Sequence, residues 1–377
     1  VVLDGMAVDW TAERLEALLQ AELPERGALD RFVAGSRGRV RALGPELAFQ
    51  VISGSVPGVG ATALMRSLLV KGPTFLKPGR GDLALPVLVA RAVAETHPAL
   101  ARSVAVVYWP GGSEEEEATV LAEADVVTAY GGDEAVESLR RRCPVTSRFA
   151  AYHHRVSFGV VGREALAPDR VVRTASEVAG AVALFDQRGC VSPQVVYVEE
   201  DGAEGPRAFA RRLAGALRVL EEHLPGGRLD PEEASALHQL RGTAELLAAG
   251  DGDVEIHHGG AAAWSVIHDP DPTSGPACVG RVVRVKPVGD LMEVVDRLRP
   301  FRAHLQTVGL AGAGDRTEEV AEALARVGAS RITGFGNVPF PPPWWHHDGR
   351  GALTPLLRWV DLEAGGGGGP APGINNE

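Results

Sequence analysis

The sequence places a cysteine on a glycine-bounded turn within Phe185–Gln194 (FDQRGCVSPQ), directly before an apolar run rich in β-branched residues. Such a turn exposes the sulfur and lets backbone N–H groups point at an oxygen bound to it. Because the thiolate is the reactive form of cysteine, the turn N–H groups and Arg188 are expected to lower the pKa of Cys190. The pattern indicates a nucleophilic thiol at Cys190, and a buried structural cysteine is the alternative that spacing alone leaves open.

Three further segments place small or basic residues directly after predicted strands. They are Gln50–Pro57 (QVISGSVP), Leu76–Arg80 (LKPGR) and Tyr130–Asp133 (YGGD). Taken alone, each segment is also compatible with an ordinary glycine-rich loop or a solvated turn. The common dinucleotide fingerprint G-x-G-x-x-G is absent from the sequence.

Together with the cysteine turn, these segments resemble the aldehyde dehydrogenase superfamily, and within it the acyl-CoA reductase family of the bacterial luminescence fatty-acid reductase. The resemblance runs in the same order from about Gln50 to Glu363. It implies an α/β fold of the aldehyde dehydrogenase type, with two doubly wound domains and the active site in the cleft between them. It also implies that Cys190 takes the acyl group as a thioester.

The family's strand and turn corresponding to Gln50–Pro57 carry an asparagine that completes the oxyanion hole with the cysteine's backbone N–H. Ser55 stands at that position here, and its hydroxyl donates one hydrogen bond from a shorter side chain. Since loss of one oxyanion donor costs on the order of a hundredfold in rate, the substitution is expected to limit turnover. By the same resemblance, Ile52 belongs to the cofactor side of the site.

The resemblance assigns the remaining segments to a nicotinamide cofactor. Lys77 corresponds to the lysine that binds the adenosine ribose, and Gly131 and Gly132 to the turn where a helix N-terminus meets the pyrophosphate. Arg80 stands where NAD-preferring relatives often have an acid, and its charge favours the 2'-phosphate of NADP. NADPH is therefore the expected cofactor, with NADH as the alternative. Asp133 departs from the superfamily's small hydroxyl residue and is expected to cap its own helix.

The segment Tyr152–Phe158 bears on the direction of the reaction. Hydrolytic aldehyde dehydrogenases carry a glutamate shortly before the cysteine to activate water, and this stretch has none. Without a positioned base for water, a thioester meets hydride or a thiol more readily than it hydrolyses, which favours acyl reduction. His154 is a candidate acid for the departing group, with a solvated loop histidine as the alternative. Thr273–Pro276 lacks the glutamate that relatives often use for the nicotinamide ribose.

The predicted function is therefore the NADPH-dependent reduction of an acyl-CoA or carrier-bound acyl thioester to an aldehyde. One alternative is an aldehyde dehydrogenase that runs towards the acid. Another is a non-catalytic, acyl-holding partner of a biosynthetic assembly, which the changed residue Ser55 motivates. Acyl-transferring enzymes are candidate partners, and the family implies a homo-oligomer.

Histidine pairs occur at His257–His258 and His346–His347. Adjacent residues point away from each other on a helix or strand, and no third ligand accompanies either pair at short spacing, so no metal site is expected. The rigid aromatic loop from Asn337 to Trp345 is expected either to line an acyl tunnel or to pack as an interdomain hinge.

Strand-length apolar runs alternate with helix-period segments along the chain, which predicts parallel sheets covered by helices. The expected parts are a nicotinamide-cofactor-binding domain with an N-terminal helical segment at 1–172, a catalytic thiol domain at 173–345, a C-terminal return segment at 346–363 and a low-complexity tail at 364–377. The expected helices include Met6–Gln20 and one long helical stretch over Pro206–Leu247.

The composition limits the class of partner. The 377 residues are 45% hydrophobic and carry a net charge of -11 without a clustered basic stripe, which disfavours nucleic acid and anionic membranes. Three cysteines without a C-x-x-C pair favour neither a disulfide framework nor zinc, so a reducing, cytoplasmic location is expected. No apolar run approaches the roughly 20 residues of a membrane span, and the first ten residues contain no basic signal region.

Overall fold

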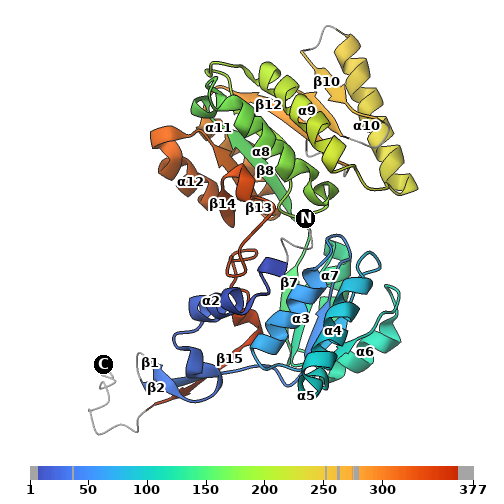
Figure 1. The fold of residues 1–377 in the computed structure, drawn as a ribbon, viewed down its shortest axis with the longest axis vertical. Coiled ribbons are helices and arrows are strands. Elements are labelled where there is room, and N and C mark those ends of the chain that lie inside the picture. Colours follow the sequence, from blue (N-terminus) through green and yellow to red (C-terminus); the bar gives the residue numbers. More distant parts are fainter. Residues whose placement is uncertain are drawn as a thin grey trace, which may run out of the picture. The chain divides into compact units, whose positions relative to one another are not determined.

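The computed structural model describes residues 7–35, 38–250, 253–260, 264–273, 275 and 280–363. They form two compact units, each with its own sheet (Figure 1). The first unit holds the described residues up to His153, together with 342–345 and 350–363. The second unit holds the described residues from His154 to Pro341, together with His346–Gly349. Near its C-terminal end, the chain therefore returns to the first unit twice.

A five-stranded parallel sheet forms the centre of the first unit, in the order β5-β4-β3-β6-β7. Its strands are β3 (Ala48–Val51), β4 (Thr74–Lys77), β5 (Val104–Val106), β6 (Val126–Tyr130) and β7 (Arg148–Tyr152). The chain winds from β3 outward to β5 and then continues on the other side of β3 with β6 and β7. The winding therefore reverses between β3 and β6, and doubly wound sheets bind ligands at the carboxyl ends of the strands at such a point.

Helices cover both faces of this sheet (Figure 1). They are α3 (Val59–Leu69), α4 (Ala84–Thr96), the short α5 (Pro98–Ala101), α6 (Glu114–Glu123) and α7 (Asp133–Arg142). Leu64 of α3 and Leu76 of β4 belong to one apolar cluster, and Phe49 of β3 and Leu121 of α6 belong to another. Both faces of the parallel sheet are thus buried, as parallel sheets require.

The first unit also contains a three-stranded antiparallel sheet, in the order β1-β2-β15. Its strands are β1 (Val33–Gly35), β2 (Gly38–Leu43) and β15 (Arg358–Leu362). The helix α2 (Ala12–Glu22) and the 3-10 turns η1 (Arg26–Leu29) and η7 (Thr354–Leu356) also belong to this unit. The Glu22 carboxylate at the end of α2 accepts hydrogen bonds from the backbone N–H groups of Leu353 and Thr354, at 2.8 and 2.9 Å. This carboxylate ties the N-terminal helix to the C-terminal segment.

A seven-stranded sheet forms the second unit, in the order β10-β11-β12-β9-β8-β13-β14, and only the β10–β11 pairing is antiparallel. Its strands are β8 (Val156–Val161), β9 (Pro193–Glu199), β10 (Glu255–His258), β11 (Ser265–His268), β12 (Val282–Val288), β13 (Leu305–Ala311) and β14 (Arg331–Thr333). Its helices are α8 (Val171–Ala183), α9 (Pro206–His223), α10 (Pro231–Ala249), α11 (Leu291–Leu298) and α12 (Thr317–Arg326). The 3-10 turns are η2 (Arg163–Leu166), η3 (Leu184–Gln187), η4 (Arg299–Phe301), η5 (Gly314–Arg316) and η6 (Phe335–Asn337). None of the described helices is both long and apolar enough to cross a bilayer.

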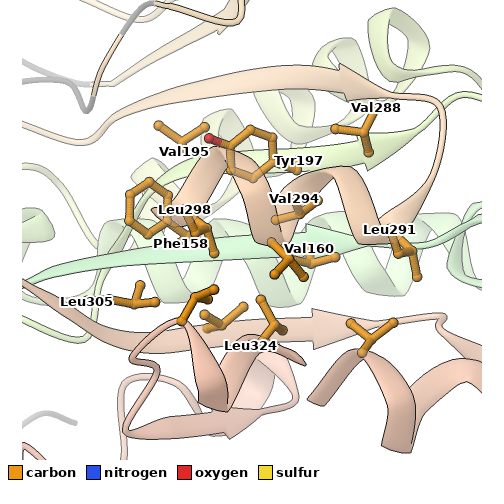
Figure 2. Packing of buried hydrophobic residues seen from close by; sticks show 14 of the residues in the cluster. Phe158, Val160, Val195, Tyr197, Val288, Leu291, Val294, Leu298, Leu305 and Leu324 are labelled. Carbon is orange, nitrogen blue, oxygen red and sulfur yellow. The ribbon is translucent and has the colours of Figure 1, made fainter. Parts of the chain in front are cut away.

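Side chains on the central strand β8 alternate between two faces of the second sheet. Phe158 and Val160 pack with α11 and α12 in one apolar cluster of this unit (Figure 2). Gly159 faces η6 instead, and a Cβ at this position would lie 2.8 Å from the ring of Phe335. Only glycine therefore allows the aromatic ring to pack directly on the strand.

The boundary between the units lies earlier than the expected residue 172. The strand at Val156–Val161 pairs with β9 and β13, so the chain has already left the first unit at His153. A continuous apolar strand has the same pattern in either sheet, so the sequence did not show which sheet it joins. Similarly, 346–363 is not one return segment, because 346–349 belongs to the second unit. The expected tail at 364–377 lies outside the described residues.

The expected long helical stretch over Pro206–Leu247 is in fact two helices, α9 and α10. A Pro-Gly-Gly sequence follows α9, and both residue types interrupt helices. The second helix starts with a capping box, in which Asp230 accepts a hydrogen bond from the backbone N–H of Glu233 at 2.8 Å. The expected helix Met6–Gln20 is also interrupted: Ala7 and Val8 are helical, a turn follows, and α2 runs from Ala12 to Glu22.

Candidate active site

The turn before Cys190 has an unusual backbone. Phe185, Asp186 and Gln187 have φ angles of 56°, 50° and 61°, in the left-handed region that non-glycine residues rarely occupy. Each such residue costs roughly 1–2 kcal/mol relative to an ordinary conformation. A run of three persists only when surrounding contacts hold it, and strain of this kind clusters at functional sites.

Gln187 supplies most of the contacts that hold the turn. Its side chain is 2% exposed, and its Nε2 donates hydrogen bonds to the carbonyls of Pro193 and Val282 at 2.8 and 2.7 Å. Its Oε1 accepts a hydrogen bond from the N–H of Val282 at 2.9 Å. One buried amide thus joins the turn to the starts of β9 and β12.

Asp186 forms a second anchor. Its carboxylate accepts a hydrogen bond from Arg281 Nε at 2.7 Å and another from the Gly227 N–H at 3.0 Å. The Arg281 side chain is 4% exposed and also donates to the Leu224 carbonyl at 2.7 Å. The residues directly before the cysteine are therefore fixed to β12 and to the loop after α9.

The backbone of Cys190 is held on the sheet by a serine. Ser157 Oγ donates a hydrogen bond to the Cys190 carbonyl at 2.6 Å and accepts one from the Thr307 N–H at 3.1 Å. Among the described residues, no backbone carbonyl accepts the Cys190 N–H. This N–H interacts instead with the Cys190 sulfur and lowers the pKa of the thiol, so it lies where it can donate to an oxygen bound at that sulfur.

The Cys190 thiol is neutral at physiological pH. The residue keeps partial exposure, yet its sulfur lies among closely packed atoms. Burial raises the pKa of the thiol to about 11, and the Asp348 carboxylate acts in the same direction. Hydrogen bonding to Gln306 and the charge of Arg155 oppose this rise.

The expectation that Arg188 lowers the pKa of this thiol is therefore wrong. Arg188 Nη2 pairs instead with Glu233 Oε2 of α10, at 2.6 Å. The sequence around Cys190 could not reveal this ion pair, because Glu233 lies 45 residues after Arg188 in the chain.

Three polar residues that the motifs did not indicate lie around the thiol. Gln306 Nε2 donates a hydrogen bond to Asp348 Oδ1 at 2.8 Å, and Arg155 Nε lies 3.2 Å from Asp348 Oδ2. Arg155 lies in Tyr152–Phe158, the segment that lacks the glutamate of hydrolytic aldehyde dehydrogenases. Asp348 directly follows the pair His346–His347, for which the sequence suggested only a metal-binding role. Gln306, in an otherwise apolar strand, was the remaining signal.

Arg331 of β14 is a further cation in this region. It donates hydrogen bonds to the carbonyls of Val338 and Asn337 at 2.9 and 2.6 Å. Burial lowers the pKa of its guanidinium to about 10, and the Cys190 thiolate acts in the opposite direction. Arg331 therefore lies close enough to Cys190 to interact with its charge.

In the first unit, the expected cofactor residues meet at the carboxyl edge of the five-stranded sheet. Ile52 follows β3 and donates its N–H to the Lys77 carbonyl at 3.0 Å, while Gly131 follows β6 and donates its N–H to the Tyr152 carbonyl at 3.2 Å. Gly132 is the N-cap of α7, so the first N–H groups of that helix are directed towards this edge. The structure thus brings Ile52, Lys77 and both glycines to the point where the winding reverses.

Asp133 does not cap its helix, contrary to expectation. Gly132 occupies the N-cap position, and Asp133 lies in the first turn, where its Oδ1 is 3.5 Å from His153 Nδ1. An acid is favourable in this turn because of the helix dipole.

The loops after β3 and β4 pack backbone to backbone. A Cβ on Gly79 would lie 2.1 Å from the Gly54 nitrogen, so only glycine fits. Asp82 accepts a hydrogen bond at 2.8 Å from the backbone N–H at the N-cap of α3. Ser55 and Arg80 lie on these two loops, and both are exposed.

Lys77, in contrast, is 7% exposed. Its Nζ lies 5.8 Å from the centre of the Trp109 ring and makes no hydrogen bond within the described part of the chain. Burial lowers the pKa of Lys77, while the charge of Glu117 opposes the shift. Glu117 itself pairs with Arg142 at 2.5 Å. The lysine therefore keeps its hydrogen-bond donors available.

The aromatic loop is divided between the two units, with Asn337–Pro341 in the second and Pro342–Trp345 in the first. Trp344 packs in the apolar cluster of the first unit, and the Arg14 guanidinium of α2 lies 5.1 Å from the centre of its ring. Of the histidine pairs, His257 contacts Glu255 at 2.7 Å and His258 contacts Glu245 at 3.3 Å.

The chain matches the sequence profile of a known family. Its sequence profile, described as acyl-CoA reductase (LuxC), matches residues 2–359. The chain belongs to this family. The resemblance drawn from the motifs is thereby confirmed, and an oxidoreductase of acyl or aldehyde groups, the predicted enzyme class, is the class of the family.

Curated relatives have consistent names. Long-chain acyl-protein thioester reductase 2 of Photobacterium leiognathi is 25% identical over 355 residues, which cover 92% of this chain and 70% of the relative. Long-chain acyl-protein thioester reductase of Aliivibrio fischeri is 27% identical over 342 residues, covering 89% of this chain and 67% of the relative.

Solved structures confirm the predicted fold class. The aldehyde dehydrogenase KauB of Pseudomonas aeruginosa superposes with a TM-score of 0.71 at 14% identity, covering 88% of this chain and 72% of that chain. An indole-3-acetaldehyde dehydrogenase of P. syringae, AldA, solved with NAD+, superposes with a TM-score of 0.70 at 14% identity over the same shares of the two chains. At this identity, the likeness concerns the fold alone.

Proposed function

We propose that this chain reduces an acyl thioester to an aldehyde, with NADPH as hydride donor and Cys190 as the residue that carries the acyl group. The observation that supports this role best is the turn itself. Three left-handed residues, Phe185, Asp186 and Gln187, are held by buried anchors shortly before a cysteine whose backbone N–H is accepted by no backbone carbonyl of the described residues. A merely structural cysteine needs no such turn.

The proposed chemistry has two stages. First, Cys190 Sγ forms a bond to the acyl carbon, the bond between that carbon and the donor sulfur breaks, and the thiol proton passes to the departing thiol. The Cys190 N–H and the Ser55 hydroxyl are the proposed donors to the oxyanion. Second, once the acyl carbon has accepted a hydride, the carbon–sulfur bond to Cys190 breaks, the aldehyde leaves and the Cys190 thiolate takes up a proton from solvent.

The carboxyl edge of the first unit suits a nicotinamide dinucleotide, which supplies the hydride when bound. Lys77 has unused donors for a ribose hydroxyl, and the N-terminus of α7 at Gly131 and Gly132 suits a pyrophosphate. The location of these residues also supports a dinucleotide site, because doubly wound sheets bind ligands where the winding reverses, and Ile52 lies at that point too. The preference for NADPH over NADH rests on Arg80, which is exposed and available to a 2'-phosphate.

For the acyl donor, we propose a long-chain acyl group on a protein thiol. The names of the relatives from Photobacterium leiognathi and Aliivibrio fischeri support this donor, and acyl-CoA is the second candidate. An acyl-transferring enzyme or a carrier protein is accordingly the proposed partner. We also propose a homo-oligomer in the cytoplasm, which the family and the cysteine pattern favour.

The test is a steady-state assay of the purified protein with NADPH and a panel of acyl-CoA and acyl-carrier thioesters, in which NADPH absorbance and aldehyde are measured together. The proposal expects equal amounts of NADPH consumed and aldehyde formed. NADP reduction with aldehydes and no added thiol is the control reaction. If only that control reaction proceeds, the chain is an aldehyde dehydrogenase, and if neither proceeds, the reductase proposal fails.

A further inference from the structure

Asp348 combines a strained backbone conformation with a buried side chain, which is unusual for a loop residue. Its φ angle is 53°, in the left-handed region, and its side chain is 1% exposed. It lies in the short segment His346–Gly349 by which the C-terminal part of the chain returns to the second unit. A buried carboxylate at a strained backbone position requires partners: Gln306 and Arg155 are the nearest, and His347 Nε2 lies 3.9 Å from Asp348 Oδ1.

The two nearest partners come from two neighbouring strands of the sheet that holds Cys190. Gln306 of β13 is 0% exposed and donates its Nε2 to Asp348 Oδ1 at 2.8 Å. Arg155, directly before β8, places Nε 3.2 Å from Asp348 Oδ2, and its side chain is 14% exposed. Since a carboxylate only accepts hydrogen bonds, it fixes which end of the Gln306 amide faces it.

That orientation matters for the thiol. An amide NH2 group has two donors, and one of them is occupied by Asp348. The other is left to interact with the Cys190 sulfur, consistent with hydrogen bonding between Gln306 and this thiol. The next residue in β13, Thr307, donates its N–H to Ser157, which in turn holds the Cys190 carbonyl. The strand therefore holds both the backbone and the sulfur of the nucleophile.

Charged groups around the thiol come from three elements. Asp348 disfavours a thiolate, while Arg155 before β8 and Arg331 of β14 favour it. Burial adds to the effect of Asp348, because it disfavours the charged form of a thiol.

We propose that Asp348 is a positioning residue that fixes the Gln306 amide as a donor to the Cys190 sulfur and, through its charge, keeps this thiol neutral in the free protein. The inference rests on the proposed function, because it concerns the same thiol. Its consequence is a nucleophile that is oriented before the acyl donor arrives but is poorly alkylated or oxidised in its absence, since both reactions require thiolate.

The test measures the alkylation rate of Cys190 by iodoacetamide between pH 7 and 9.5, by peptide mass spectrometry, without acyl donor or NADPH. In Asp348→Asn, the amide oxygen still accepts the Gln306 hydrogen bond, and asparagine tolerates the left-handed backbone, so the variant removes the charge and the ion pair with Arg155 while it keeps the contact to Gln306. A thiol pKa lower by one unit gives tenfold more thiolate, which is about threefold less nucleophilic, so alkylation is expected to be about threefold faster.

Gln306→Met provides the opposed variant. It keeps the approximate volume of the buried side chain but removes the donor to the sulfur, so the thiol pKa rises and Cys190 alkylation slows. General loosening of the fold would accelerate both variants. Cys143, in the first unit, is the internal control: its rate is expected to be the same in all three proteins.

The inference is overturned if Asp348→Asn does not accelerate Cys190 alkylation, or if both variants change it in the same direction. An accelerated Cys143 reports unfolding, and the comparison is then made with Asp348→Glu, which keeps the charge and is expected to leave the pH profile of Cys190 in place. A shifted profile in Asp348→Glu also overturns the inference. Failure of the proposed function is separate, because it appears as absence of an acyl group on Cys190 whatever its alkylation rate.

Discussion

The cysteine turn of the second unit and the strand-end loops of the first unit hold their functional residues in different ways. The turn fixes Cys190 through buried side chains, chiefly Gln187 and Asp186, and accepts three left-handed residues to do so. The loops after β3 and β4 are fixed through their backbones, by contacts between Gly54 and Gly79, and leave the tips of Ser55 and Arg80 exposed.

The difference follows from what each region is proposed to do. A nucleophile must be held to within a fraction of an ångström of its reacting position, whereas residues that bind a dissociable cofactor must be accessible to it. Substitutions in the turn are therefore expected to change both folding and chemistry. Substitutions at the loop tips are expected to change kinetics while stability stays the same.

The largest expected effect comes from removing the nucleophile. Cys190→Ala is expected to lower acyl-reductase turnover by at least about a thousandfold, as loss of a covalent nucleophile does in other enzymes. Because the hydrogen bond from Ser157 to the carbonyl of residue 190 does not involve the sulfur, the thermal midpoint should stay within a few degrees. Cys143→Ala, the matched control, should keep its turnover. Retained activity in Cys190→Ala would show that the turn of the second unit does not hold the nucleophile.

The anchor of the turn comes next. Gln187→Ala leaves the Val282 N–H and two carbonyls without partners in a buried region, at about 1–3 kcal/mol for each unsatisfied group. We expect the free energy of unfolding in urea to fall by about 3–4 kcal/mol. Gln239→Ala, on the exposed face of α10, should change it by less than about 0.5 kcal/mol. Equal effects of the two variants would show that the turn is not held as described.

Ser55 tests the loop after β3. Ser55→Ala should lower kcat by about a hundredfold through loss of an oxyanion donor, and Ser55→Asn should raise kcat above that of the native chain. Both variants should unfold at the native temperature, because the Ser55 side chain is exposed. If kcat is insensitive to both changes, the oxyanion is stabilised without this loop.

The smallest expected effect concerns Arg80. Arg80→Ala should raise KM for NADPH by about tenfold, the order expected for one lost charge-assisted contact, with KM for NADH unchanged. Lys77→Met should raise both KM values, because the adenosine ribose is common to the two cofactors. A change in KM for NADH alone, or in neither, would contradict the assignment of Arg80 to a 2'-phosphate.

Alternating strands and helices made most of the fold predictable. The run Leu47–Ile52 and the segments that follow it match β3 to α7 closely, because apolar strand runs are separated there by clear helical periods. The boundary at residue 172 was wrong because β8 is apolar on both faces and fits either sheet. Strands β1 and β2 are short, and their small and apolar residues are interrupted only by Arg39 and Arg41, so they have no strong period.

The site was predictable only where its residues are neighbours in the sequence. Cys190 and its turn could be recognised because FDQRGC is continuous, and the two glycines because they separate a strand from a helix. Asp348 and Gln306 reach the thiol from segments more than a hundred residues further along the chain, so only the folded sheet brings them together. The raised pKa of Cys190 could not be predicted for the same reason, since burial and a distant carboxylate cause it.

The most direct test of the account is intact-mass analysis of the protein after exposure to a long-chain acyl thioester without NADPH, followed by peptide mapping and addition of NADPH. The account predicts one acyl group on Cys190, none in Cys190→Ala, and its release as an aldehyde when NADPH is added. An acyl group on another residue, or one on Cys190 that NADPH leaves in place, would contradict it.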